Sequence, residues 1–269
     1  MSTIVITGAS SGIGAIAARR LAEQGHEIAV VGRNPQRTRA VAADTGGRPF
    51  IADYDSLASV RDLASALLDA YASIEVLLNN AGGLVSPRGL TADGNEKTFQ
   101  HNHLAPFLLT NLLLERLEAS GGRVISTSSV MNRIGRVRLD DLQWEKRRWH
   151  GGWKAYGTSK LETILFIREL ARRTSLEAYS VHPGYVATQF GTDSPLIRIS
   201  ALLRSGGFGV PAEEGAAPLI RLASDQNVPG DNGGYFDRMT ASGASPAQAR
   251  DAHLAAELWE ASARLVSLS

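Results

Sequence analysis

The first fourteen residues constrain this chain more than any other stretch. A β-branched run, Thr3 to Thr7, leads directly into the glycine-rich segment Gly8 to Gly14, GASSGIG. Apolar residues then recur at helical spacing, which predicts a strand, a tight turn and a helix. Gly8 lets the chain turn off the strand, Gly12 lets backbone approach a pyrophosphate, and Gly14 lets the helix lie close to the sheet. Because a helix N-terminus presents free N–H groups and a positive dipole end to an anion, we expect a dinucleotide site.

Strand-like and helix-like segments alternate along the rest of the chain. Further strands are predicted at Glu27 to Gly32, Pro49 to Ala52, Glu75 to Leu78, Arg123 to Thr127, Ala178 to His182 and Gly234 to Phe236. Helices are predicted at Pro35 to Ala43, Ser56 to Tyr71, Glu96 to Glu118, Ala155 to Arg173, Ala212 to Ser224 and Pro246 to Leu265. Repeated βα units with continuous apolar strands indicate an α/β fold, a doubly wound Rossmann-type parallel sheet with helices on both faces. No linker or repeat divides the chain, so we predict one domain over residues 1–269.

Composition excludes several classes of protein. The net charge of +1 gives no reason to expect a nucleic-acid partner. The chain has no cysteine, which excludes disulfides and thiolate metal sites, and no metal site is predicted. Strand character begins at Thr3, leaving no room for a signal peptide. No apolar run reaches the length of a membrane span, so we expect a cytoplasmic protein.

The end of the second predicted strand indicates which nucleotide is bound. An acidic residue about twenty positions after the glycine turn would bind the adenosine ribose hydroxyls. Here that place holds Gly32-Arg33-Asn34. The planar guanidinium of Arg33 can stack on adenine and pair with a 2′-phosphate, so NADP(H) is predicted. The alternative is an arginine that only faces solvent. Asp53, after the third strand, is expected either to accept a hydrogen bond from adenine or to cap the next helix.

Two further stretches indicate acid–base chemistry. Tyr156 and Lys160 are four residues apart, which places a phenol and an ammonium on one face of a helix. A phenol with the ordinary pKa of about 10 exchanges protons poorly at neutral pH, and a neighbouring cation favours the phenolate. Ser128 and Ser129 follow the fifth strand, where a hydroxyl can hold a substrate oxygen.

The order of these motifs along the chain is similar to that in a known protein family. The turn TGASSGIG, the string NNAG at Asn79 to Gly82, and YGTSK at Tyr156 to Lys160 resemble the short-chain dehydrogenase/reductase family over nearly the whole chain. The segment HNHLAPFLLT is also similar to the family, and LDDLQWEKRRWHGG, KLETILFIRELARR and LWEASARLVSL resemble its retinol-dehydrogenase-like branch. The resemblance implies a catalytic tetrad of Asn102, Ser129, Tyr156 and Lys160, with Ser128 as the alternative serine.

The resemblance also implies the mechanism and the cofactor contacts. Hydride would pass between nicotinamide and a carbonyl, with Tyr156 as proton donor, Lys160 tuning it and binding ribose, Ser129 orienting the carbonyl and Asn102 holding a relay water. The expected cofactor-binding residues are Gly8, Ser10, Ser11, Gly12, Ile13, Gly14, Arg33, Asn34, Asp53, Tyr54, Asn79, Ala81, Gly82, Tyr156, Lys160, Pro183, Gly184, Val186 and Thr188.

Two segments bear on the substrate. Residues 133–152 are an insertion between the catalytic serine and tyrosine. Three tryptophans lie in this insertion or directly after it: Trp144, Trp149 and Trp153. They either form the wall of an apolar substrate entrance or pack the insertion onto the body of the protein or onto another subunit. Lys146-Arg147-Arg148 are interpreted as a solvated face. Residues 189–210 combine apolar residues with glycines, which suits a substrate lid, although core packing alone would also explain the apolar residues. We therefore expect a medium-sized apolar ketone, aldehyde or secondary alcohol, in a pathway such as specialised metabolism.

The sequence is also compatible with two other classes of function and with several assembly states. An NADP(H)-binding sensor or scaffold would share the fold but would not need the tetrad. Epimerases and dehydratases of the extended branch are usually longer and have a differently spaced turn. The resemblance implies a homodimer or homotetramer that forms through the helices carrying Asn102 and Tyr156. The apolar residues of the second helix would permit this contact, although a helix buried within one chain would look the same and a monomer stays open; these residues are Leu161, Ile164, Leu165, Ile167 and Leu170.

Overall fold

Seven parallel strands form the centre of the computed structural model, which describes residues 1–184 and 211–268. The strands are β1 (Thr3–Ile6), β2 (Glu27–Gly32), β3 (Arg48–Ile51), β4 (Val76–Asn79), β5 (Arg123–Thr127), β6 (Glu177–His182) and β7 (Tyr235–Asp237). Their order is β3-β2-β1-β4-β5-β6-β7, and every pair is parallel. The order reverses between β1 and β4, where a doubly wound sheet opens a crevice for ligands. The predicted doubly wound Rossmann-type fold is confirmed.

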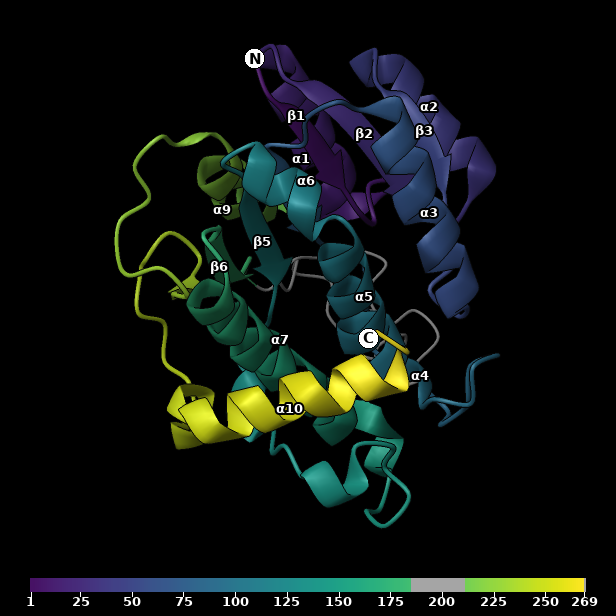
Figure 1. The fold of residues 1–269 in the computed structure, drawn as a ribbon, viewed down its shortest axis with the longest axis vertical. Coiled ribbons are helices and arrows are strands. Elements are labelled where there is room, and N and C mark those ends of the chain that lie inside the picture. The colour runs from purple at the N-terminus through teal and green to yellow at the C-terminus, as the bar shows by residue number, and fades with distance from the viewer. Residues whose placement is uncertain (185–210, 269) are drawn as a thin grey trace.

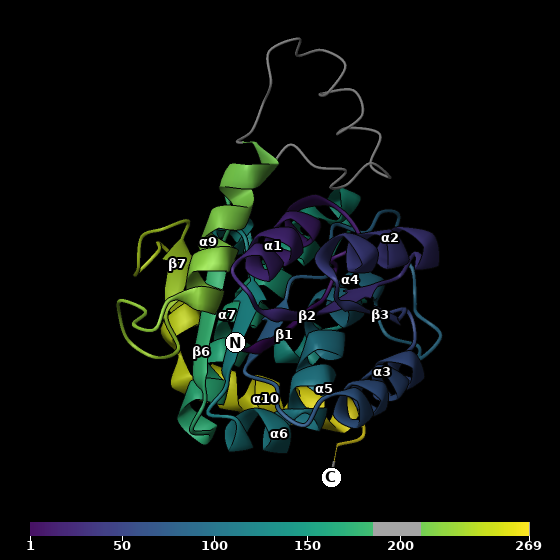
Figure 2. The same ribbon diagram turned by 90° about the horizontal axis from the view of Figure 1, so that it is seen from above.

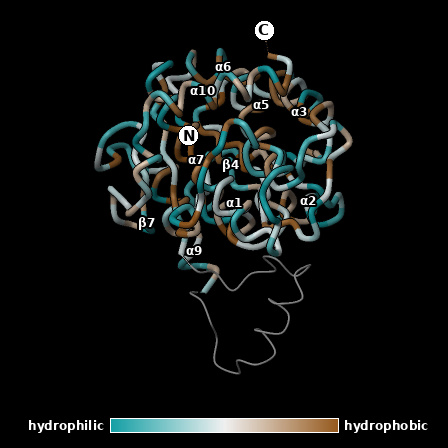
Figure 3. The backbone as a smooth tube through the Cα atoms, turned by 90° about the horizontal axis from the view of Figure 1, so that it is seen from below, coloured by the Kyte–Doolittle hydropathy of each residue, from teal (hydrophilic) through white to brown (hydrophobic). Residues whose placement is uncertain are grey.

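Helices cover both faces of this sheet (Figures 1 and 2). One face carries α1 (Gly12–Glu23), α2 (Pro35–Thr45) and α9 (Ala212–Ser224). The other carries α3 (Leu57–Ala70), α5 (Ala105–Leu112) and α7 (Trp153–Arg173). The short helices are α4 (Lys97–Phe99), α6 (Leu114–Ala119), and 3-10 turns at Val130–Ile134, Leu139–Asp141, His150–Gly152 and Ala247–Arg250. The central strands are buried on both sides, and hydrophobic stretches run through the middle of the molecule (Figure 3).

One predicted helix is broken. The sequence predicts a continuous helix from Glu96 to Glu118, whereas the structure has α4, a π-helical turn at Gln100–Leu104, then α5 and α6. Pro106 has no N–H to donate to the carbonyl of Asn102 four residues earlier, so a regular α-helical ladder cannot pass this point. The π-helical turn accommodates the proline and carries Asn102. Such turns are frequent at functional sites.

A last helix, α10 (Ala252–Leu265), lies across α5 and α7 (Figure 1). The ring of Trp259 packs against Phe107 and Phe166, with centroids 4.9 and 5.8 Å apart. The five α7 residues named above as permitting subunit contact are each 0% exposed inside this one chain. They stabilise the body of the domain and do not form an exposed surface. No helix among residues 1–184 and 211–268 is both long and apolar enough to cross a membrane.

Trp259→Ala should test how much α10 contributes to the domain. Aromatic truncation in a core costs about 3–5 kcal/mol, and Trp259 is only partly buried, so we expect a loss of about 2 kcal/mol. Urea denaturation measures the loss. The control is Leu265→Ala on the same helix, which is 38% exposed and should cost less than about 0.5 kcal/mol. Equal losses in both variants would contradict docking of α10 through Trp259.

Candidate active site

The glycine turn forms a cradle at the start of α1. Gly8 has φ +66° and Gly12 has φ +58°, which side chains rarely adopt. A Cβ on Gly14 would lie 2.5 Å from the Gly8 carbonyl oxygen and 2.6 Å from Asn80 Nδ2, so only glycine fits there. Ser11, the N-cap residue, makes no side-chain hydrogen bond to the first turn, and that turn has no acidic residue. The turn therefore leaves backbone N–H groups available to an anion, and its residues fit a dinucleotide pyrophosphate.

Thr7 and Asn80 hold this turn against the end of β4. Thr7 Oγ1 accepts hydrogen bonds from the backbone N–H groups of Asn80 and Ala81, both at 3.0 Å. Asn80 Nδ2 donates to the Thr7 carbonyl at 3.0 Å, and its Oδ1 accepts from Thr127 Oγ1 at 3.3 Å. Asn80 thus connects the ends of β1, β4 and β5. It was not among the predicted site residues, although its place in the NNAG string could have identified it.

The nucleotide end of the site lies beyond β2 and β3. Arg33 is exposed after β2, with no hydrogen bond or ion pair to the other described residues. Asn34 caps α2, its side chain accepting from Arg37 N at 2.9 Å. Asp53 Oδ1 accepts from the N–H of Asp55 at 3.1 Å. The helix cap that was the alternative role for Asp53 is supplied by Ser56.

The other predicted cofactor residues have different surroundings. Tyr54 is buried, which raises its pKa. Asn79 is also buried and donates to Thr110 Oγ1 at 2.9 Å, so its amide points away from the glycine turn. Gly82 (φ +151°) and Ala81 follow β4, and Pro183-Gly184 follow β6. Val186, Thr188 and the predicted lid at 189–210 lie outside the described residues.

Asn102 connects the segment after β4 to the helix that carries the tyrosine. Its Nδ2 donates to the Gly83 carbonyl and to Ser159 Oγ, both at 2.9 Å, and its Oδ1 accepts from Gly83 N at 2.8 Å. Ser159 Oγ in turn donates to the Tyr156 carbonyl at 2.8 Å. The amide of Asn102 is therefore used in positioning the segment after β4 and α7.

Tyr156 and Lys160 lie side by side on α7, as their spacing predicts. They are 5% and 4% exposed, and Lys160 Nζ is 5.6 Å from the centre of the Tyr156 ring. Lys160 Nζ also donates to the Thr127 carbonyl at 2.9 Å. Burial lowers the pKa of Lys160 to about 8. A cation beside the phenol ring favours loss of the phenolic proton, which suits acid–base work near neutral pH.

The two serines after β5 have different environments. Ser128 is buried, and its Oγ donates to the Lys160 carbonyl at 2.7 Å. Ser129 is only half-buried, and its Oγ accepts from Met131 N at 3.2 Å at the start of a 3-10 turn. Ser128 is therefore used in the packing of β5 on α7. Ser129 keeps a hydroxyl that can also donate to a substrate oxygen.

The insertion at 133–152 packs onto the body of the same chain. The Val137 backbone exchanges two hydrogen bonds of 3.1 Å with the side chain of Gln248, before α10. Gln143 Oε1 accepts from Glu96 N at 2.7 Å, and its Nε2 donates to Asn95 Oδ1 at 2.8 Å. These bonds anchor the insertion at two separate places.

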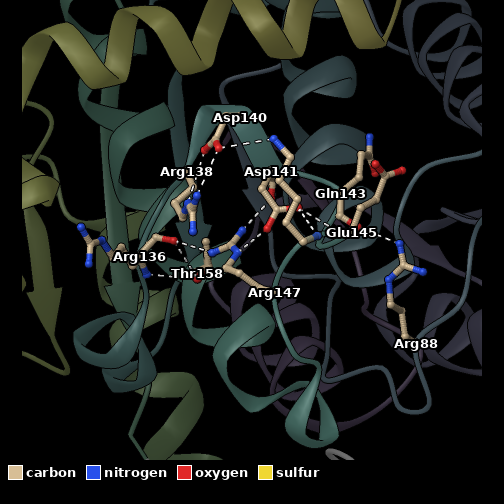
Figure 4. Close-up of polar contacts among 10 residues, drawn as sticks. Arg88, Arg136, Arg138, Asp140, Asp141, Gln143, Glu145, Arg147 and Thr158 are labelled. Atoms are coloured by element: carbon tan, nitrogen blue, oxygen red, sulfur yellow. Dashed lines mark hydrogen bonds and ion pairs between the residues drawn. The ribbon is translucent and has the colours of Figure 1, made fainter.

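Several polar contacts within the insertion are made by the side chain of Asp141 (Figure 4). Its carboxylate pairs with Arg147 Nε at 2.8 Å and accepts from the N–H groups of Glu145 and Lys146 at 2.8 and 3.0 Å. Burial raises the pKa of Asp141, but these hydrogen bonds outweigh burial and hold that pKa below its usual range. The Arg147 guanidinium also lies 3.7 Å from the ring centre of Trp144.

The tryptophans and the basic residues of the insertion have different surroundings. Trp144 is 5% exposed and packs edge-to-face with Trp149 at 6.2 Å, so these rings pack the insertion itself. Trp153 is half-buried at the start of α7. Arg147 is paired, whereas Lys146 and Arg148 are exposed as predicted for a solvated face.

Comparison with known proteins identifies the family. The sequence profile described as short chain dehydrogenase matches residues 2–141. A protein of Streptomyces sp. (strain C5), named as a candidate daunorubicin C-13 ketoreductase, is 44% identical over 98% of this chain and 92% of its own. Human retinol dehydrogenase 13 is 34% identical over 99% of this chain and 85% of its own. The crystal structure of an uncharacterised protein from Mycobacterium paratuberculosis superposes with a TM-score of 0.80 at 37% identity, covering 99% of this chain and 94% of that one.

The chain therefore belongs to the short-chain dehydrogenase/reductase family and matches its retinol-dehydrogenase-like branch. Members of this family are oxidoreductases that act on alcohol or carbonyl groups with a nicotinamide cofactor.

Asp141→Ala should loosen the insertion. It removes the partner of Arg147, whose side chain is only 15% exposed, so we expect a loss of about 3 kcal/mol in unfolding free energy. The neighbouring variant Asp140→Ala removes an exposed ion pair to Arg138 and should leave stability near that of the wild type. Chemical denaturation at pH 7 compares the two. Because the folded pKa of Asp141 is lowered, the difference should shrink as the pH falls below about 4.

Proposed function

We propose that this protein is an NADP(H)-dependent reductase or dehydrogenase that interconverts a medium-sized apolar ketone or aldehyde and its alcohol. The main support is the buried pair of Tyr156 and Lys160 on α7, with the half-buried hydroxyl of Ser129 at the end of β5. A sensor or scaffold that only binds nucleotide has no use for a buried ammonium next to a phenol. The name of the Streptomyces relative, a C-13 ketoreductase, supports a ketone as substrate.

In the proposed mechanism the protein supplies position and a proton. The nicotinamide, when bound, supplies or accepts the hydride at the substrate carbon. Ser129 donates a hydrogen bond to the substrate oxygen and holds it beside the Tyr156 hydroxyl. In reduction, Tyr156 gives its proton to that oxygen as the carbonyl double bond is lost, and the Lys160 ammonium stabilises the resulting phenolate. Asn102 keeps α7 in register with the segment after β4.

The coenzyme would lie along the carboxyl ends of the strands. Gly8, Ser10, Ser11, Gly12, Ile13 and Gly14 would bind the pyrophosphate, and Lys160 the nicotinamide ribose. Asp53 is proposed to contact adenine. Arg33 would recognise the 2′-phosphate, because its guanidinium is exposed at the end of β2 without a carboxylate partner among the described residues. A cytoplasmic protein that assembles as a homodimer or homotetramer remains part of the proposal.

Arg33→Ala should weaken NADPH binding more than NADH binding. Hydrogen bonds between charged groups contribute about 1.5–3 kcal/mol, so the ratio of the two dissociation constants should change by about 10- to 100-fold. Isothermal titration calorimetry with both coenzymes measures this ratio. Arg39→Ala, on the exposed surface of α2, is the control and should leave the ratio unaltered. If wild-type protein bound NADH as tightly as NADPH, the proposed preference would be wrong.

Tyr156→Phe should abolish turnover without weakening coenzyme binding. Loss of the proton donor should reduce kcat by about 10²- to 10⁴-fold. NADPH oxidation, followed by absorbance with a panel of apolar ketones, aldehydes and quinones, measures the rate. Tyr71→Phe is the matched control, because its buried hydroxyl has no hydrogen-bond partner among the described residues. Tight NADPH binding without turnover on any substrate would favour the sensor, and preference for small sugars or charged acids would contradict an apolar pocket.

A further inference from the structure

A basic cavity lies between the insertion and α7, and the proposed reaction does not use it. Its volume is about 650 Å³, within the range of small-molecule sites. Of the eleven described residues that line it, five are arginine or lysine and none is acidic, although the net charge of the chain is only +1. Like charges held close together repel one another, and a bound anion would offset this repulsion. The five cations are Arg136, Arg138, Arg147, Arg148 and Lys154.

The cavity lies on the face of α7 opposite to the proposed active site. Lys154 and Thr158 both line it and are four residues apart, which places them on one face of the helix. Tyr156 is two residues from each of them. Because an α-helix turns by about 100° per residue, two residues bring Tyr156 to roughly the opposite face. An anion in this cavity would therefore not compete with substrate beside the Tyr156 hydroxyl.

A close contact between two glycines brings the basic segment onto this face of α7. A Cβ on Gly135 would lie only 2.4 Å from the carbonyl oxygen of Gly157, so a side chain at Gly135 would keep the two segments apart. The backbone of the next residue is held on both sides (Figure 4). Arg136 N donates to Thr158 Oγ1 at 3.1 Å, and the Arg136 carbonyl accepts from Arg147 Nη1 at 2.9 Å. These bonds fix the backbone of Arg136 and leave its guanidinium unused.

Nearby carboxylates neutralise only two of the five cations. Arg147 pairs with the buried Asp141 at 2.8 Å, and Arg138 pairs with the exposed Asp140 at 3.1 Å. The side chains of the other three are exposed and make no ion pair or hydrogen bond to the described residues; they are Arg136, Arg148 and Lys154. Three unpaired positive charges around one cavity match an anion with two or three negative charges.

The backbone along one wall of the cavity has a sparsely populated conformation. Trp144 and His150 line the cavity with φ of +54° and +45°, and Gly151 continues the left-handed run at +71°. Positive φ is unfavourable for residues other than glycine, and such residues cluster at ligand sites. The Trp144 ring is itself held by the Arg147 guanidinium, 3.7 Å from the ring centre. The fold therefore maintains an unfavourable backbone at the wall of this basic cavity.

We propose that this cavity binds a small organic anion with two or three negative charges, carried by phosphate or carboxylate groups. The planar guanidinium groups of Arg136 and Arg148 would each bind a pair of anionic oxygens, and Lys154 would add a third charge from α7. The cations surround one cavity of limited volume, which favours a small molecule over a polymer such as a nucleic acid.

Isothermal titration calorimetry of the full chain tests the proposal, with citrate as the probe for carboxylates and pyrophosphate as the probe for phosphates. NADPH is added first, so that the glycine turn and Arg33 are occupied. We expect one anion per chain with a dissociation constant below about 1 mM. The probe that binds more tightly identifies the anionic group that the cavity prefers.

Two neighbouring substitutions locate the anion. Arg148→Gln and Lys146→Gln each remove an exposed cation directly beside Arg147, but only Arg148 lines the cavity. Arg148→Gln should weaken binding about 10-fold or more, and Arg136→Gln should do the same from the other segment. Lys146→Gln should weaken binding less than about 2-fold. Absence of binding by both probes, or equal losses in Arg148→Gln and Lys146→Gln, would overturn the proposal.

Thermal unfolding separates a binding role from a structural one. Citrate or pyrophosphate should raise the melting temperature of the wild type. Without anion, Arg136→Gln and Arg148→Gln should melt no lower than the wild type, because each removes one of several like charges. Variants that melt well below the wild type without anion would assign these side chains a structural role and overturn the proposal.

This inference goes beyond the proposed reductase activity and does not depend on it. The comparison of Arg148→Gln with Lys146→Gln locates the anion whether or not NADPH binds, and no turnover is measured. Failure of the anion site is therefore distinguishable from failure of the reductase proposal, which the Tyr156→Phe comparison decides.

Discussion

The close approach of the glycine turn to the end of β4 is the constraint on which the rest of the site depends. Gly14 lies so near the Gly8 carbonyl and Asn80 that any side chain there would collide with both. Thr7 and Asn80 join these segments by hydrogen bonds of 3.0 Å. These contacts place the start of α1 beside the ends of β1 and β4, where the strand order reverses and doubly wound sheets bind their ligands.

A second connection extends from the same segment to the proposed catalytic helix. Asn102 bonds to the backbone of Gly83 on one side and to Ser159 on the other, and Ser159 lies between Tyr156 and Lys160 on α7. Because Pro106 prevents a regular helix at Asn102, the π-helical turn places this amide between the two elements. The glycine turn and Tyr156 are thus connected through one set of hydrogen bonds, and α10 packs on it through Trp259 and Ser262.

Burial gives this framework its electrostatic character. Lys160 loses hydration, which lowers its pKa to about 8, and burial lowers the pKa of His103 to about 3, so this ring stays neutral near pH 7. In the insertion the opposite balance holds for Asp141, because three hydrogen bonds outweigh the cost of burial. Loss of hydration therefore lowers the pKa of Lys160 in the site. In the insertion the same loss is offset by the hydrogen bonds that the Asp141 carboxylate accepts.

The fold and the order of the site's parts along the chain were predictable from local sequence patterns. Alternating apolar segments indicated the parallel sheet, and β2, β5 and α9 begin and end where they were predicted. The pair Tyr156 and Lys160 followed from helical spacing, because local periodicity is sufficient to place two side chains on one face. The glycine turn was readable for the same reason, since its strand, turn and helix are contiguous in the chain.

The separate roles of neighbouring residues, by contrast, depend on contacts that form only in the folded chain. Ser128 and Ser129 are adjacent and chemically identical, and their difference arises from the contact of Ser128 with α7, 32 residues away in sequence. Asn80 was overlooked beside Asn79 because its partners, Thr7 and Thr127, come from other strands. The burial of the apolar face of α7 under α10 likewise depends on contacts between distant segments. Such contacts leave no periodic pattern in a single sequence, and three-dimensional packing alone establishes them.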